Sequence, residues 1–163
     1  MLQHGEAVHE HYRALFDRLE KGEECEQLQK VWALLKDQLP PIDALKRYHV
    51  FHDCGKHLCR TIDDCGKQHF TNHAEMSAQQ YALVWPSDTV TPHLIRHDMA
   101  FHSARGEELG LIWKDQMAPI LYFTAWAEIY ANAEMFGGTQ SESFKIKRSR
   151  LIQAAKKRLA QTE

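Results

Sequence analysis

Residues 119–136, PILYFTAWAEIYANAEMF, decide the fold class because nearly all of the side chains in this stretch are apolar or small. A helix that is apolar on all sides is stable only when other elements cover it, so we expect a central core helix here. The pair Gly137–Gly138 ends this helix, since glycine readily adopts the left-handed conformation at helix ends. Glu128 interrupts the apolar run and would place a carboxylate in the core.

The segments before this stretch show the spacing of amphipathic helices. Apolar residues three and four positions apart predict a first helix that ends at Gly22 and a second over residues 26–39, which Pro40–Pro41 stop. Asp43 is placed to cap a further helix through residues 44–58, ALKRYHVFHDCGKHL. The apolar stripe of the first helix consists of Val8, Tyr12, Leu15, Phe16 and Leu19.

The remaining segments continue the helical pattern. Residues 60–72, RTIDDCGKQHFTN, predict a polar loop, a helix follows from about His73 to Trp85, and another begins after Pro86. Ser141 or Ser143 is suited to cap a final amphipathic helix. Since no segment shows a sustained alternation typical of strands, we predict an all-α fold: a compact helical bundle that forms a single domain over residues 1–163.

Composition excludes several classes of protein. No stretch reaches the ~18 continuous apolar residues of a membrane span, and the N-terminus MLQHGEAVHEHY lacks the regions of a signal peptide, so we expect a cytoplasmic protein without membrane contact. The formal charge of −2 predicts no general attraction to nucleic acid, although residues 143–163 are locally basic. The four cysteines form no CxxC pair and are expected to be reduced thiols, with a cysteine-bound zinc as the alternative.

Two His-Asp dipeptides stand in apolar surroundings, His52–Asp53 in YHVFHDCGKHLCR (48–60) and His97–Asp98 in LIRHDMAFH (94–102). A buried carboxylate costs several kcal/mol unless a charge compensates it, and Asp53 has no arginine one helical turn away. A divalent cation would compensate both carboxylates at once, because His, Asp and Glu are ligands for transition metals. Six other histidines are expected to be structural or solvent-facing: His9, His11, His49, His57, His69 and His93.

The order of these residues resembles the HD-domain superfamily of metal-dependent phosphohydrolases. HDCGK (52–56) is similar to the His-Asp motif that gives the superfamily its name, and HAEMSA (73–78) is similar to its next histidine motif. The resemblance implies one or two divalent transition metal ions, of Mn, Fe, Ni, Co or Zn. The family commonly has Asp as its last ligand, whereas here either Glu128 or Asp98 takes that place. The implied ligands are His4, His52, Asp53, His73, His97, Asp98 and Glu128.

The resemblance also implies roles for individual residues. Asp53 would bridge two ions, His4 and Glu128 would complete one site, and His73, His97 and Asp98 the other. Metal ions of this kind activate water and hold phosphoryl oxygens. Lys56 is placed to contact a phosphate oxygen, and His102 to protonate the leaving oxygen or else to be an ordinary surface histidine. Ser143 and Lys145 are expected in a phosphate cradle next to the glycine turn, with a solvated basic face as the alternative.

Several stretches are similar to a narrower branch, the HD phosphatase module of bacterial RNA end-healing enzymes. They include HFTNHAEMSA (69–78) and AEIYANAEMFGGTQSESFKIK (127–147). This resemblance implies removal of 2′,3′-cyclic phosphates and of 2′ or 3′ phosphates from RNA ends. Because the chain has no GxxxxGK[ST] loop, a polynucleotide kinase or ligase would be a separate partner. Two alternatives stay open: a small nucleotidase or deoxynucleotide triphosphohydrolase, and a non-catalytic HD domain that binds a nucleotide.

Overall fold

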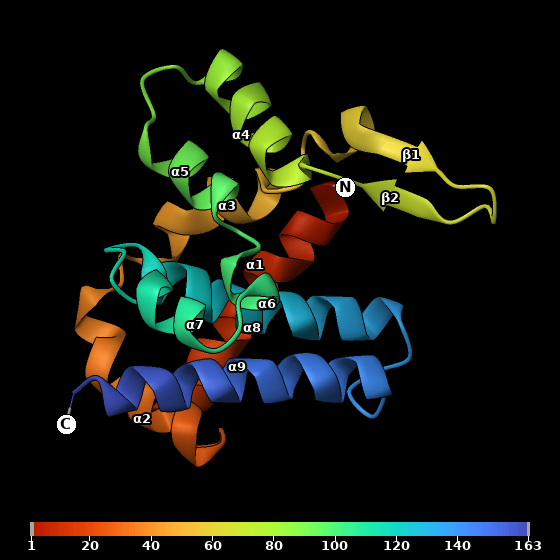
Figure 1. Cartoon of the computed structure of the whole chain (residues 1–163). Coiled ribbons are helices and arrows are strands. Elements are labelled where there is room, and N and C mark those ends of the chain that lie inside the picture. Colours follow the sequence, from red (N-terminus) through yellow and green to blue (C-terminus); the bar gives the residue numbers. More distant parts are fainter. Residues whose placement is uncertain (1, 163) are drawn as a thin grey trace.

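The computed structural model describes residues 2–162 and has the all-α fold that the sequence predicts (Figure 1). A two-stranded sheet projects from the helices. Three short 3-10 segments, η1 to η3, lie between them. The elements are α1 Leu2–Glu20, α2 Glu26–Leu35, η1 Lys36–Gln38, η2 Ile42–Leu45, α3 Lys46–Phe51, η3 Lys56–Cys59, β1 Arg60–Ile62, β2 Gln68–Phe70, α4 His73–Val84, α5 Val90–Arg96, α6 Ala100–Ser103, α7 Glu107–Ile112, α8 Ala118–Met135 and α9 Glu142–Ala160.

Helix α8 forms the centre of the bundle, as its apolar sequence predicts. Fourteen of its eighteen residues are buried, and α1 and α9 both pack against it. The fully buried aromatic residues Tyr122, Phe123 and Trp126 supply much of this contact. Since α8 is covered along most of its length, Glu128 is held inside the protein with only 5% of its surface exposed.

The predicted C-terminal end of α8 and the predicted N-terminal cap of α9 are confirmed. Gly137 and Gly138 have φ angles of 89° and 75°, and the Gly138 N–H donates to the Ala133 carbonyl at 2.7 Å. The Ser141 hydroxyl accepts a hydrogen bond from the Phe144 N–H at 3.2 Å, so Ser141 rather than Ser143 caps α9. A sharp glycine turn therefore sends α9 back along α8.

The helix predicted over residues 44–58 is wrong at its C-terminal half. Helix α3 ends at Phe51, and His52 and Asp53 lie in the turn that follows. The cause is a contact with α4: a Cβ atom at Gly55 would lie 2.6 Å from the Ser77 nitrogen, and the Gly55 N–H donates to the Ser77 hydroxyl at 2.9 Å. Asp98 likewise lies in a turn after α5 rather than on a helix.

The polar loop predicted over residues 60–72 is instead a β-hairpin. Strands β1 and β2 pair antiparallel, with Arg60 opposite Phe70 and Ile62 opposite Gln68. Asp63 closes the turn, since its Oδ1 accepts from the N–H groups of Cys65 and Lys67 at 3.0 and 2.9 Å. Because the strands have three residues each and are mostly exposed, no apolar alternation marks them in the sequence.

In the part of the chain that the structure describes, no helix has the length and apolar character needed to cross a membrane.

Candidate metal centre

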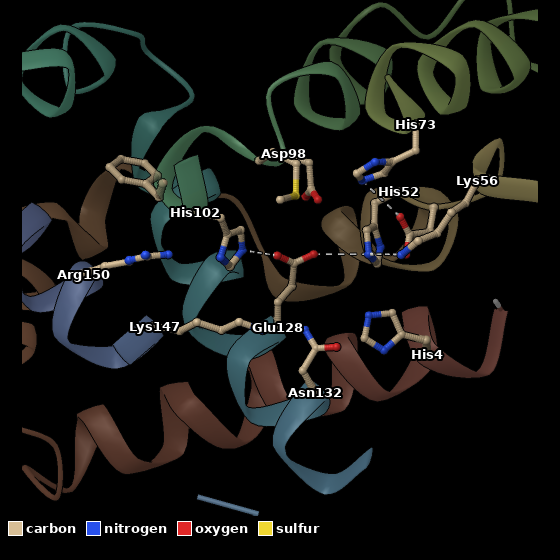
Figure 2. A pocket seen from close by; sticks show the side chains of 13 residues that line it. His4, His52, Lys56, His73, Asp98, His102, Glu128, Asn132, Lys147 and Arg150 are labelled. Atoms are coloured by element: carbon tan, nitrogen blue, oxygen red, sulfur yellow. Dashed lines mark hydrogen bonds and ion pairs between the residues drawn. The ribbon is translucent and has the colours of Figure 1, made fainter. Parts of the chain in front are cut away.

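A cavity of about 300 Å³ opens where several segments of the chain meet, and most of the predicted site residues line it (Figure 2). It lies between α1, the turn after α3, the start of η3, α4, the α5–α6 connection, α6, α8 and α9. Eight of the predicted residues are present. The lining residues are His4, His52, Asp53, Lys56, His73, Asp98, Met99, Phe101, His102, Glu128, Asn132, Lys147 and Arg150.

Two groups of metal-ligand atoms share His52. One consists of His4, His52 and Asp53, the other of His52, Asp98 and Glu128, and within each group the ligand atoms all lie within 4.8 Å of one another. Both groups combine imidazole nitrogen with carboxylate oxygen, a donor set that suits divalent transition metals. The residues present therefore fit a divalent ion, and a second ion would have to bind without the shared His52 nitrogen.

Backbone carbonyls orient two of the histidines toward the carboxylates. His52 Nδ1 lies 2.7 Å from the His49 carbonyl oxygen and His73 Nδ1 lies 2.9 Å from that of Phe70. A carbonyl oxygen only accepts, so Nδ1 carries the proton in both rings. Nε2 is then the free position, and it lies 3.2 Å from Glu128 in His52 and 3.7 Å from Asp53 in His73. Metal-binding histidines are commonly fixed in this way.

His4 reaches the cavity because α1 crosses α3 at very short range. A Cβ atom at Gly5 would lie 2.5 Å from the carbonyl oxygens of His49 and Val50, so only glycine permits this approach. The ring centroids of His4 and His52 are 5.5 Å apart. Buried His4 Nδ1 has no hydrogen-bond partner among the described residues. An unsatisfied buried nitrogen costs roughly 1–3 kcal/mol, and a bound cation would remove this cost.

Asp53 is compensated by a cation that the protein itself provides. Lys56 Nζ lies 2.9 Å from Asp53 Oδ2, and His73 approaches the other oxygen. This lysine faces the cavity, so its predicted contact with phosphate would have to form beside Asp53. Asp53 and Lys56 therefore present a carboxylate and an ammonium group to the same space.

Glu128 lies between two imidazole rings, His102 Nε2 at 2.5 Å and His52 Nε2 at 3.2 Å (Figure 2). Burial opposes ionisation of Glu128, but the hydrogen bond and charge of His102, together with His52, lower its pKa. Burial likewise opposes protonation of His102, yet its bond to Glu128 raises the pKa of this imidazole. Glu128 is thus held as a carboxylate and His102 as an imidazolium.

Asp98 and His52 show how strongly negative this space is. Burial and the neighbouring Glu128 raise the pKa of Asp98, which also accepts a hydrogen bond from the Tyr48 hydroxyl at 2.5 Å. Burial alone would lower the pKa of His52, but Asp98, Glu128 and Asp53 together raise it to about 9. Protons thus neutralise part of the carboxylate charge, and a cation that bound here would displace them.

Three predicted residues do not line the cavity. His97 is exposed, and its ring lies at a tilt of 50° to that of His93, with the centroids 4.5 Å apart. Ser143 lines a smaller hollow with Phe136 and Lys147. Lys145 points to solvent and pairs with Glu142 at 3.2 Å. His97 and Asp98 both lie in the turn after α5, and only the aspartate of this dipeptide lines the cavity.

Sequence reasoning missed Asn132, Lys147 and Arg150. Asn132 follows Glu128 by four residues on α8, which places both on one face of this helix. Lys147 and Arg150 are three residues apart on α9 and reach the end of the cavity near His102, away from His4 and His73 (Figure 2). These spacings are the only sequence signal, because α9 carries cations on several faces.

Comparison with models of protein families, with curated proteins and with solved structures finds no match.

Proposed function

We propose that this protein is a metal-dependent phosphohydrolase that acts on phosphate esters of nucleotides or RNA ends, as a 2′,3′-cyclic phosphodiesterase and a 2′ or 3′ phosphomonoesterase. One observation carries the proposal: a single cavity combines a set of imidazole and carboxylate metal ligands with cationic side chains. The metal ligands suit a divalent ion. The cationic side chains suit the negatively charged phosphate of a substrate.

The ligand set supports the metal part of the proposal. His52 has one free nitrogen and can bind one ion, which either His4 and Asp53 or Asp98 and Glu128 would help to hold. A second ion would rely on the residues of the other group. When bound, a divalent ion supplies Lewis-acid activation of water and of phosphoryl oxygens. The unsatisfied His4 nitrogen and the fixed orientation of His52 both fit this use.

The cationic residues support a phosphate ester as substrate. Lys147 and Arg150 enter from α9, and Lys56 enters from the turn after His52–Asp53. Arg150 can bind a phosphate through two parallel hydrogen bonds, and the lysines act as point charges. In this arrangement the substrate phosphate lies between the ligand set and α9.

His102 supports general acid catalysis. Despite burial, its bond to Glu128 raises the pKa of the imidazole and so favours the protonated form, and its ring faces the cavity next to Lys147 and Arg150. A general acid needs such a proton close to the leaving oxygen. Glu128 orients this ring through the bond to Nε2.

A substrate panel tests the proposal and separates it from its alternatives. Protein reconstituted with Mn, Fe, Ni, Co or Zn and passed through gel filtration is analysed for metal, then assayed with RNA 2′,3′-cyclic phosphate ends, 2′ and 3′ phosphate ends, nucleoside monophosphates and deoxynucleotide triphosphates. We expect bound metal and preferential hydrolysis of the RNA ends. Preference for free nucleotides would favour the nucleotidase or triphosphohydrolase alternative, and metal below one equivalent with no hydrolysis would favour the non-catalytic one.

A further inference from the structure

A groove along α9 adjoins the cavity of the candidate metal ligands. Its volume is about 560 Å³, and it lies between the start of α7 and the C-terminal half of α9. Arg150 lines both the groove and the cavity, so the two hollows share a wall. Among the described residues, three further cations line the groove, Arg105, Lys156 and Lys157, against one carboxylate, Glu107.

The cations follow one side of α9 from the cavity to the groove. Lys147, Arg150 and Lys157 are three and seven residues apart, spacings that keep side chains on one face of a helix. At ~1.5 Å per residue, Lys147 and Lys157 are separated by about 15 Å along the axis. This row begins at the cavity and ends in the groove.

The charge of this row is not neutralised by the rest of the described chain. Among residues 2–162, no carboxylate pairs with Lys147, Arg150, Lys156 or Lys157, whereas Lys145 on another side of α9 pairs with Glu142. The protein as a whole has a formal charge of −2, so this positive surface is local. Arg105 adds to it from a fixed position, since its Nη1 donates to the carbonyls of His102 and Ala104.

We propose that the groove binds the phosphodiester backbone of a single-stranded polynucleotide whose terminal phosphate lies in the cavity of the candidate metal ligands. This inference rests on the proposed function and deepens it by naming the substrate as a strand rather than a mononucleotide. A row of about 15 Å spans several phosphates, because successive phosphates of a stacked strand rise ~3.4 Å. A mononucleotide held at the cavity would leave Lys156 and Lys157 without a ligand group.

The lining of the groove also predicts how the strand is bound. No aromatic side chain lines it, so base stacking contributes little, and the contacts are those of cations with phosphates. Binding of this kind depends weakly on base sequence and strongly on salt. The affinity should therefore increase with strand length until the row of cations is filled.

Binding is measured on metal-free protein, so that the result does not depend on hydrolysis. Fluorescently labelled strands of two, four and eight nucleotides with the same 3′ phosphate are titrated at several salt concentrations and followed by anisotropy. The test variant is Lys156→Gln/Lys157→Gln. The matched control is Lys21→Gln/Lys36→Gln, which removes the same charge from exposed positions outside the groove.

We expect the eight-nucleotide strand to bind about tenfold more weakly to the groove variant. Its log–log salt slope should be shallower by about 1.4, because each of two phosphates that the variant no longer neutralises accounts for ~0.7 of the slope. The control should bind like the original protein. Weaker binding to the same extent in both variants, affinity independent of strand length, or equally strong competition by polyglutamate would each overturn the inference. Equal thermal unfolding midpoints exclude misfolding as the cause.

Hydrolysis provides a second readout that separates this inference from the proposed function. If the protein hydrolyses phosphate esters, the ratio of kcat/KM for the eight-nucleotide strand to that for the mononucleotide should fall in the groove variant. An active enzyme whose ratio is the same in the groove variant and in the original protein would overturn the inference that the groove binds the strand. It would leave the proposed phosphohydrolase activity unaffected. Strand binding without hydrolysis of any substrate would support the groove and contradict the proposed function.

Discussion

His49 and His52 lie three residues apart in the same segment and are both buried, with 0% and 4% of their surfaces exposed, yet their environments have opposite effects. Burial, followed by the nearby His9 and His52, lowers the pKa of His49 to about 3. Three carboxylates raise the pKa of His52 to about 9 despite its burial. Burial therefore does not distinguish a structural histidine from a candidate ligand; the neighbouring carboxylates do.

The partners of the two histidines explain the difference. His49 Nε2 lies 3.0 Å from the Thr124 hydroxyl and His49 Nδ1 lies 2.9 Å from His9 Nδ1. One ring donates and the other accepts, so both nitrogens are satisfied by neutral groups. His52 instead faces Glu128 and stands beside His4, whose Nδ1 has no partner among the described residues. A bound cation would therefore be favourable next to His52 but not next to His49.

The strongest test of this comparison is Asp53→Ala, which removes the carboxylate next to His52. We expect hydrolysis to fall at least about a thousandfold, because the substitution removes a proposed metal ligand and, with it, the negative charge that would favour the ion. The measurements are kcat/KM and metal content after gel filtration. Asp63→Ala on the exposed hairpin turn is the control. Retained activity in Asp53→Ala, with unfolding like that of the control, would contradict the metal centre.

Glu128→Gln and Asp98→Asn test which acid is the main ligand. Glu128→Gln keeps the size of the side chain but loses a charge held next to two imidazoles, so we expect metal affinity and rate to fall about a hundredfold. Asp98→Asn should lower metal affinity and rate about tenfold, an effect typical of groups that orient ligands. The reason is that Asp98 accepts a hydrogen bond from Tyr48 and has a raised pKa. The opposite order of the two effects would make Asp98 the acidic ligand.

The neutral histidine pair predicts a loss of stability in acid. Below pH 6.5 the unfolded chain binds a proton at His49, whereas the folded protein does not until about pH 3. Stability therefore falls as the pH falls through this window, by about 1.4 kcal/mol per pH unit for this one proton. Urea unfolding between pH 4 and 7 should give a flatter profile for His49→Asn than for the control His57→Asn. Parallel profiles would show that His49 is protonated in the fold.

The smallest effect is expected at His97. Its exposed ring contacts His93 outside the cavity, so His97→Asn should change metal content and rate less than about threefold. His73→Asn should reduce both about a hundredfold, because its Nε2 faces Asp53. Comparable reductions in the two variants would mean that the turn after α5 rearranges when metal binds.

The sequence predicts the fold better than it predicts the geometry of the site. Periodic apolar residues locate the helices, and eight of the predicted site residues do line one cavity. The pattern cannot reveal that Gly55 meets α4, so it places His52 and Asp53 on a helix instead of a turn. It also cannot show which face of α9 turns inward, and therefore favours Ser143 and Lys145 over Lys147 and Arg150. Both errors concern contacts between segments distant in sequence.

The contact between Gly55 and Ser77 has a consequence for protein engineering. It fixes the turn that carries Asp53 against α4. The hairpin tip at residues 63–67 lies beyond the paired strands and does not position the candidate ligands. Exposed tips of this kind are the positions at which chains best tolerate foreign segments. We expect a fluorescent reporter or affinity tag inserted after Asp64 to leave metal content intact. A labelled protein of this design would allow immobilisation with the cavity and α9 unobstructed.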